Sequence, residues 1–124
     1  MYSLHTAQAP AAHGPVSQGA SAGRLVCVSG QLSVDPATGE FVDGTVARQA
    51  MRALDNLQAV VEAAGIELSD VVKVTLYLKD LDDLAVVDTI YELRFPQPCP
   101  ARTVVQVAGL PHGALVQFDC TAVR

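Results

Sequence analysis

The residues whose side chains are best suited to binding or catalysis lie on the last two predicted strands of the chain. Arg102 and Val104 share one side of the first strand, and Gln117 and Asp119 share one side of the second. If these strands pair as a hairpin, Arg102 lies across from Gln117 and Asp119. The planar guanidinium fork of an arginine is well suited to hold a small carboxylate. The pattern therefore indicates a small anion pocket, and an ordinary exposed ion pair between Arg102 and Asp119 is the common alternative.

The sequence gives less support to nucleotide binding, metal binding or catalysis by a serine or cysteine nucleophile. There is no G-x-S-x-G, P-loop or G-x-G-x-x-G motif. The three histidines are scattered without ligand spacing, so we expect no metal site. Cys27 and Cys120 lie in apolar runs and are expected to be buried, inert thiols, whereas Cys99 in a Pro-rich loop is expected to be exposed.

One long amphipathic helix is predicted in the first half of the chain. Apolar residues recur there at spacings of three and four between Thr45, a good N-cap, and Gly65, a good C-terminal stop. The outer face of this helix is polar and is expected to be solvated. A second helix is predicted from Leu84, capped by Asp82 or Asp83 and ended by Pro96.

Strand patterns surround these two helices. Alternation of apolar and polar residues predicts a half-buried strand at 72–79. Further strands are predicted at 24–29, 102–107 and 115–123, and a weak edge strand at 2–6, with loop at 9–23. Two helices laid on one face of a mixed sheet give a two-layer α+β fold, with residues 1–124 as a single domain.

Composition narrows the function classes. The chain has 124 residues, a formal charge of −5, 50% hydrophobic and 17% charged residues. An acidic balance and few aromatic residues argue against a nucleic-acid-binding protein, which needs clustered cations. The charged fraction is below the usual 25%, which suggests surface covered by copies of the same chain.

The sequence also bears on the location of the protein in the cell. No apolar stretch approaches the 18 to 20 residues that span a bilayer, and the first 14 residues lack the basic and apolar parts of a secretory signal. Three cysteines without a C-x-x-C pair suit a reducing compartment. We therefore expect a cytoplasmic protein without membrane partners.

Short motifs in a fixed order carry a family resemblance over nearly the whole chain. They are Gly14-Pro15-Val16-Ser17-Gln18-Gly19, Ser29-Gly30-Gln31, Asp35-Pro36, Thr38-Gly39-Glu40, Leu54-Asp55-Asn56, Val60-Val61-Glu62-Ala63-Ala64-Gly65, Lys79-Asp80-Leu81 and Pro100-Ala101-Arg102. In this order they resemble the Rid superfamily, the YjgF-type reactive-intermediate deaminases.

The resemblance implies a chorismate-mutase-like fold assembled as a homotrimer, with pockets between subunits. Family members of the deaminase type hydrolyse small enamines and imines such as 2-aminoacrylate, and they need no metal or cofactor. The family arginine that clamps the substrate carboxylate matches Arg102. Water then attacks the imine carbon and ammonia leaves.

Four pocket positions depart from the deaminase pattern. Val16 stands where the family has a tyrosine, Asp88 where it has an asparagine, Val104 where it has a cysteine, and Gln117 where it has a glutamate. Gln117 can hydrogen-bond a water molecule but cannot take its proton. Asp119 projects to the same side and is a possible substitute, and Asp88 indicates a ligand with an amino group.

Two functions follow from the resemblance. The first is a deaminase in which Arg102 anchors the substrate, Ser29 and the backbone near Val104 line the pocket, and Gln117 orients water. The second is a trimeric binder or sensor of a small carboxylate metabolite that performs no chemistry, because four pocket residues are changed. Some members of the superfamily have been described as ribonucleases, which the charge of −5 does not favour here.

Overall fold

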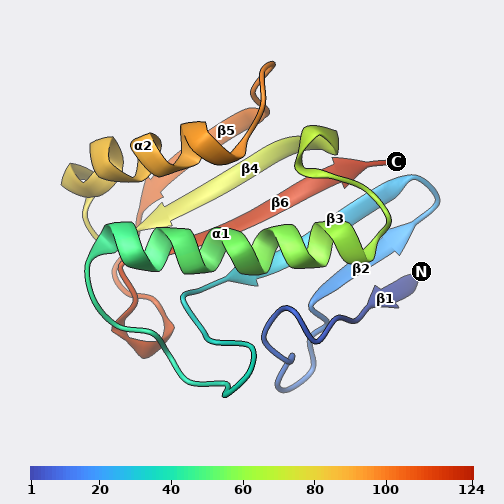
Figure 1. The fold of residues 1–124 in the computed structure, drawn as a ribbon, viewed down its shortest axis with the longest axis horizontal. Helices are drawn as coiled ribbons and strands as arrows, with labels where there is room; N and C mark the ends of the chain where they lie inside the picture. Colours follow the sequence, from blue (N-terminus) through green and yellow to red (C-terminus); the bar gives the residue numbers. More distant parts are fainter.

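The computed structural model describes residues 1–124 and forms one six-stranded sheet with two helices on a single face (Figure 1). The strands are β1 (Tyr2–Leu4), β2 (Gly19–Ala22), β3 (Leu25–Gln31), β4 (Val71–Leu78), β5 (Ala101–Gln106) and β6 (Val116–Val123), and the helices are α1 (Val46–Ala63) and α2 (Leu84–Arg94). Only β4 and β5 pair in parallel; the other pairs are antiparallel. The predicted two-layer α+β fold with a mixed sheet is confirmed.

Helix α1 forms where its apolar period predicts. The Thr45 side chain accepts a hydrogen bond from the Arg48 amide at the start, and Gly65, with φ +77°, follows the end of the helix. The apolar stripe is buried against β3 and β6, so the helix lies along the middle of the sheet (Figure 1). Two polar side chains, Gln49 and Asn56, are buried with that stripe, which the pattern did not predict.

Helix α2 joins the two parallel strands as a crossover, since parallel neighbours cannot be linked by a tight turn. Its start differs from the prediction. Asp82 and Asp83 lie in a short 3₁₀ turn, and the Asp80 side chain caps that turn by accepting from the Asp82 amide, while Asp83 makes no cap bond. Within this region the Asp83 and Leu84 amides donate to the carbonyls of Asp80 and Leu81, so the 3₁₀ turn leads directly into α2.

Three details of the strands correct the sequence-based expectations. Gly19–Ala22, expected as loop, pairs with β1 and β3 as β2. A bulge between Val71 and Lys73 leaves Val72 exposed instead of buried. Cys27 is exposed because Val26 and Val28 take the inward positions of β3, whereas Cys120 is buried as predicted.

The order of strands in the sheet is β1-β2-β3-β6-β4-β5, and it overturns the predicted hairpin. Strand β4 lies between β5 and β6 and pairs with both. Consecutive strands are often neighbours in space, but here β5 follows its crossover to the edge beside β4, and β6 returns to the middle of the sheet. The residues of the two last strands are therefore separated by a whole strand.

Buried amides fasten the loops to this framework. The Gln18 side chain accepts from the Thr6 amide at 2.8 Å and donates to three carbonyls of the 6–10 segment. The Asn56 side chain donates to the carbonyls of Leu32 and Val34, both at 2.9 Å. These bonds satisfy backbone groups that the loops would otherwise leave without partners.

Candidate functional site

Arg102 and Gln117 lie on opposite faces of the sheet. Arg102 is in register with buried Val74, so it lies on the face that the helices cover. Gln117 is in register with Tyr77, whose side points away from the core. Within one chain these two predicted catalytic residues do not meet, contrary to the hairpin prediction.

The Arg102 pocket opens between α2 and β5. It has a volume of about 280 Å³ and is lined by Asp88, Tyr91, Glu92, Cys99, Pro100 and Arg102. The guanidinium carbon lies 4.8 Å from the centre of the Tyr91 ring, a cation–π contact, and Nη1 donates to Asp88 Oδ1 at 2.5 Å. Nε and Nη2 make no hydrogen bond within the chain. The arginine is thus held in place from two sides and retains free donors.

The partner of Arg102 is therefore Asp88 and not Asp119. The Asp119 carboxylate instead accepts a hydrogen bond from the Tyr77 hydroxyl at 2.7 Å on the open face of the sheet. That hydrogen bond, together with partial burial and the nearby charge, raises the pKa of Tyr77 above its ordinary value. The alternative of an Arg102–Asp119 ion pair is wrong.

Tyr91 both lines this pocket and belongs to the buried core, and it was not among the predicted site residues. Its ring stacks on Phe95 with centroids 4.4 Å apart, and burial raises the pKa of its hydroxyl to about 12. Asp88, Tyr91 and Glu92 are three and four positions apart on α2, so they share one face of the helix. That spacing was the available signal for grouping them.

The Ser29 pocket lies at the other end of the predicted site. It has a volume of about 150 Å³ and is lined by Pro10, Ala11, Ala12, Val16, Ser17, Gln18, Ser29, Gly30, Gln31, Leu32 and Val34. The Ser29 hydroxyl donates to the Ser17 carbonyl at 2.6 Å, which holds the Val16 loop against β3. Gln117 packs directly over Gly30, since a Cβ built there would lie 2.5 Å from Gln117 Nε2.

The predicted site residues thus fall into two groups. Val16, Ser29 and Gln117 gather at the Ser29 pocket, and Asp88 and Arg102 at the Arg102 pocket. Strands β3 and β5 are three strand spacings apart, roughly 14 Å. Val104 lies two residues beyond Arg102 on the same face, half-buried beside the core, and does not line the pocket.

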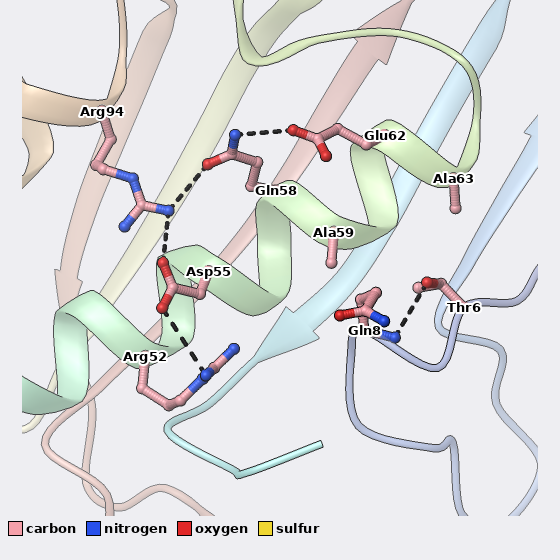
Figure 2. Close-up of a pocket in the computed structure, with 9 residues that line it drawn as sticks. All are labelled: Thr6, Gln8, Arg52, Asp55, Gln58, Ala59, Glu62, Ala63 and Arg94. Atoms are coloured by element: carbon pink, nitrogen blue, oxygen red, sulfur yellow. Dashed lines mark hydrogen bonds and ion pairs between the residues drawn. The ribbon is translucent and has the colours of Figure 1, made fainter. Parts of the chain in front are cut away.

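A larger hollow of about 530 Å³ lies on the outer side of α1, away from both pockets (Figure 2). Figure 2 shows Arg94 reaching from α2 to Asp55 and Gln58 of α1, at 2.8 and 2.9 Å, while Arg52 faces Asp55 from the other side. Gln58 in turn donates to Glu62. The charged groups of this hollow pair mainly among themselves, and the bonds of Arg94 link α2 to α1.

Two kinds of feature are absent from the structure. Nowhere do three or more His, Cys, Asp or Glu side chains gather as a metal-binding group. Neither helix is long and apolar enough to cross a membrane.

Fold and pockets together define a class of protein: a two-layer α+β domain with an arginine-lined pocket between α2 and β5 and a smaller, largely apolar pocket beside Ser29. The chain belongs to the family described as Endoribonuclease L-PSP, whose model matches residues 6–124, and the Rid (YjgF-type) resemblance is confirmed with it.

Three relatives illustrate the likeness. A 2-iminobutanoate/2-iminopropanoate deaminase of Escherichia coli K12 is 45% identical over 124 residues, which cover 98% of this chain and 96% of the relative. The crystal structure of RidA from Psychrobacter has a TM-score of 0.95, with 40% identity over 100% of both chains. That of E. coli TdcF with bound serine has a TM-score of 0.92, with 36% identity over 100% of this chain and 99% of the other.

Proposed function

We propose that this chain is a hydrolytic deaminase of small imine and enamine acids, anchored by Arg102. The observation that carries the proposal is the state of that arginine. Its guanidinium is fixed on the Tyr91 ring and by Asp88, yet Nε and Nη2 remain without partners beside an open pocket. Two free donors on one planar group match the two oxygens of a carboxylate.

The reaction needs little from the protein beyond orientation. Water adds to the imine carbon while the C=N electron pair moves to nitrogen, which takes up the proton that the water releases. The hydroxyl proton of the resulting carbinolamine then moves to the nitrogen, and an oxygen electron pair forms the C=O bond as the C–N bond breaks. Ammonia leaves and a 2-oxo acid remains. Gln117 holds the attacking water by accepting from it and donating to it, and the substrate nitrogen, not a side chain, receives the proton. Holding water and substrate together accelerates a step that also occurs in solution.

Because Arg102 and Gln117 lie on opposite faces, the complete site is built from two copies of the chain, as a homotrimer with shared pockets provides. The open face of the sheet supports this assembly. It exposes Leu25, Cys27 and Val105, with exposed fractions of 46% for Leu25 and 36% for Val105. Its Lys73 donates to the Thr103 hydroxyl and its Asp119 accepts from the Tyr77 hydroxyl, so each of these two charged groups already has one hydrogen-bond partner within the chain.

The relatives add support. Proteins named 2-iminobutanoate/2-iminopropanoate deaminase are 45% identical in E. coli and 43% identical in Bos taurus, over 98% of this chain in both cases. The serine bound to TdcF is a small acid with a carboxylate, the group that Arg102 is placed to hold. These relatives favour an enzyme over a binder without activity, and we propose that it acts in the cytoplasm.

The test is pyruvate release from 2-aminoacrylate generated by a serine dehydratase, with and without this protein. We expect acceleration by the wild type and its loss in Arg102→Ala. Arg48→Ala is the matched control, because Arg48 is an exposed arginine of α1 whose side chain makes no hydrogen bond. Equal rates for wild type and Arg102→Ala would remove the proposed anchor. Binding of 2-oxobutyrate without any acceleration would move the assignment to a carboxylate sensor.

A further inference from the structure

The Arg102 pocket contains more negative than positive charge. One guanidinium faces two carboxylates, Asp88 and Glu92, which gives the lining a formal charge of −1. A pocket that served only to capture a small anion would not need either carboxylate beside its arginine, because each one repels that anion. The carboxylates therefore have to be considered together with the Arg102 guanidinium.

The two carboxylates are placed differently. Asp88 contacts Arg102 directly through Oδ1, and its side chain remains 35% exposed. Its second oxygen, Oδ2, accepts no hydrogen bond within the chain. Glu92, one position beyond Tyr91, is exposed and bonds nothing. Asp88 is thus the acceptor that lies at the anchor itself.

Free donors and a free acceptor consequently stand side by side. Nε and Nη2 of Arg102 are available to a carboxylate, while Oδ2 of Asp88 is available to an N–H group or a cation. In a 2-amino acid or a 2-iminium acid the carboxylate and the nitrogen are both attached to the same carbon, C2. Such a ligand presents one charge of each sign at the spacing of this pair.

We propose that Asp88 makes the Arg102 pocket selective for zwitterions, so that it prefers ligands with a carboxylate and a cationic nitrogen over plain 2-oxo acids. The inference rests on the proposed function and deepens it. The protonated imine is a zwitterion, whereas the 2-oxo acid product has lost the positive charge. Asp88 is then a specificity-determining residue that favours substrate over product and promotes product release.

The test uses two ligands that differ at one group, L-2-aminobutyrate and 2-oxobutyrate. Calorimetric titration of the wild type is expected to show about tenfold tighter binding of the amino acid. Asp88→Asn keeps the side-chain shape and removes the charge, so it should weaken L-2-aminobutyrate and tighten 2-oxobutyrate, each by about tenfold. Inhibition of imine hydrolysis by 2-oxobutyrate should strengthen in the same proportion.

Asp82→Asn is the matched control, because Asp82 is an exposed carboxylate outside the pocket whose side chain makes no ion pair. It should leave the preference unchanged. If the wild type binds 2-oxobutyrate as well as the amino acid while it still hydrolyses the imine, the inference about Asp88 is wrong and the deaminase proposal stands. If the wild type binds neither ligand and hydrolyses no imine, both proposals are wrong.

Discussion

Replacing Gly30 is expected to displace Gln117 with little effect on the stability of the fold. A Cβ at Gly30 would lie 2.5 Å from Gln117 Nε2 and 2.8 Å from its Cδ, atoms at the end of a flexible, half-buried side chain. Gln117 therefore swings aside in Gly30→Ala. Moving Gln117 costs some stability, whereas the loss of backbone freedom in the unfolded chain stabilises the variant by about 0.4–1 kcal/mol. We therefore expect the free energy of unfolding to change by about 1 kcal/mol or less.

Gly19→Ala is the matched comparison in the neighbouring strand. There a Cβ would lie 2.9 Å from the Cys27 carbonyl oxygen and 2.9 Å from Val60 Cγ1. Neither the backbone of a paired strand nor a core side chain can move freely, so overpacking should cost about 1–3 kcal/mol. For 124 residues the unfolding entropy implies about 4 °C per kcal/mol, hence a melting temperature lower by about 4–12 °C.

The assay is thermal unfolding at one protein concentration, together with the rate of imine hydrolysis. Gly30→Ala should melt within about 4 °C of the wild type yet lose about tenfold or more in rate, because Gln117 no longer holds the water. Two results would refute the reasoning. One is a melting temperature for Gly30→Ala as low as that of Gly19→Ala, and the other is an unchanged rate.

Two further predictions concern stability. Asn56→Ala leaves the carbonyls of Leu32 and Val34 without their donor in a buried place, so urea unfolding should show a loss of about 3 kcal/mol, and a loss below about 1 kcal/mol would contradict the role given to Asn56. Burial raises the pKa of Tyr91 and of the Cys120 thiol, from 10.0 and 9.0, to about 12 in each case. Both groups therefore bind their protons more tightly when folded, and stability that is complete below pH 9 falls as the pH rises toward 12, by about 1 kcal/mol from Tyr91 and about 3 kcal/mol from Cys120 at pH 11. Cys120→Ala should lose correspondingly less stability between pH 8 and pH 11, whereas equal losses in the two proteins would show that Cys120 does not contribute.

Local sequence patterns predicted most helices and strands, but they did not predict which strands pair with one another. The apolar period of α1 and its two caps are properties of adjacent residues, so the sequence contains them directly. The pairing of β5 with β4 depends on where a crossover helix packs, and nothing in the residues of β5 and β6 alone reports it. The hairpin expectation, and with it the contact between Arg102 and Gln117, failed for that reason.

Several of the predicted residues line the two pockets, but the way the residues are divided between the pockets was not predicted. Arg102 is suited to a carboxylate by its side chain alone, and Asp88 was assigned to the pocket by family resemblance. Their ion pair joins a helix to a strand 14 positions away, and no local spacing rule connects two such elements. Asn56 was missed as a buried residue because its partners, the carbonyls of Leu32 and Val34, belong to an irregular segment that folds over α1.

The central claim is that catalysis takes place where the Arg102 pocket of one copy meets the Ser29 pocket of another. It is tested most directly by mixing two variants, Arg102→Ala and Gly30→Leu, each of which should be nearly inactive alone. The two variants are unfolded and refolded together in equal amounts, so each shared site takes its Arg102 pocket and its Ser29 pocket at random from either variant. Both pockets are intact in about one quarter of the sites, and about a quarter of wild-type imine hydrolysis should return. Activity that stays at the level of the separate variants would contradict a shared site.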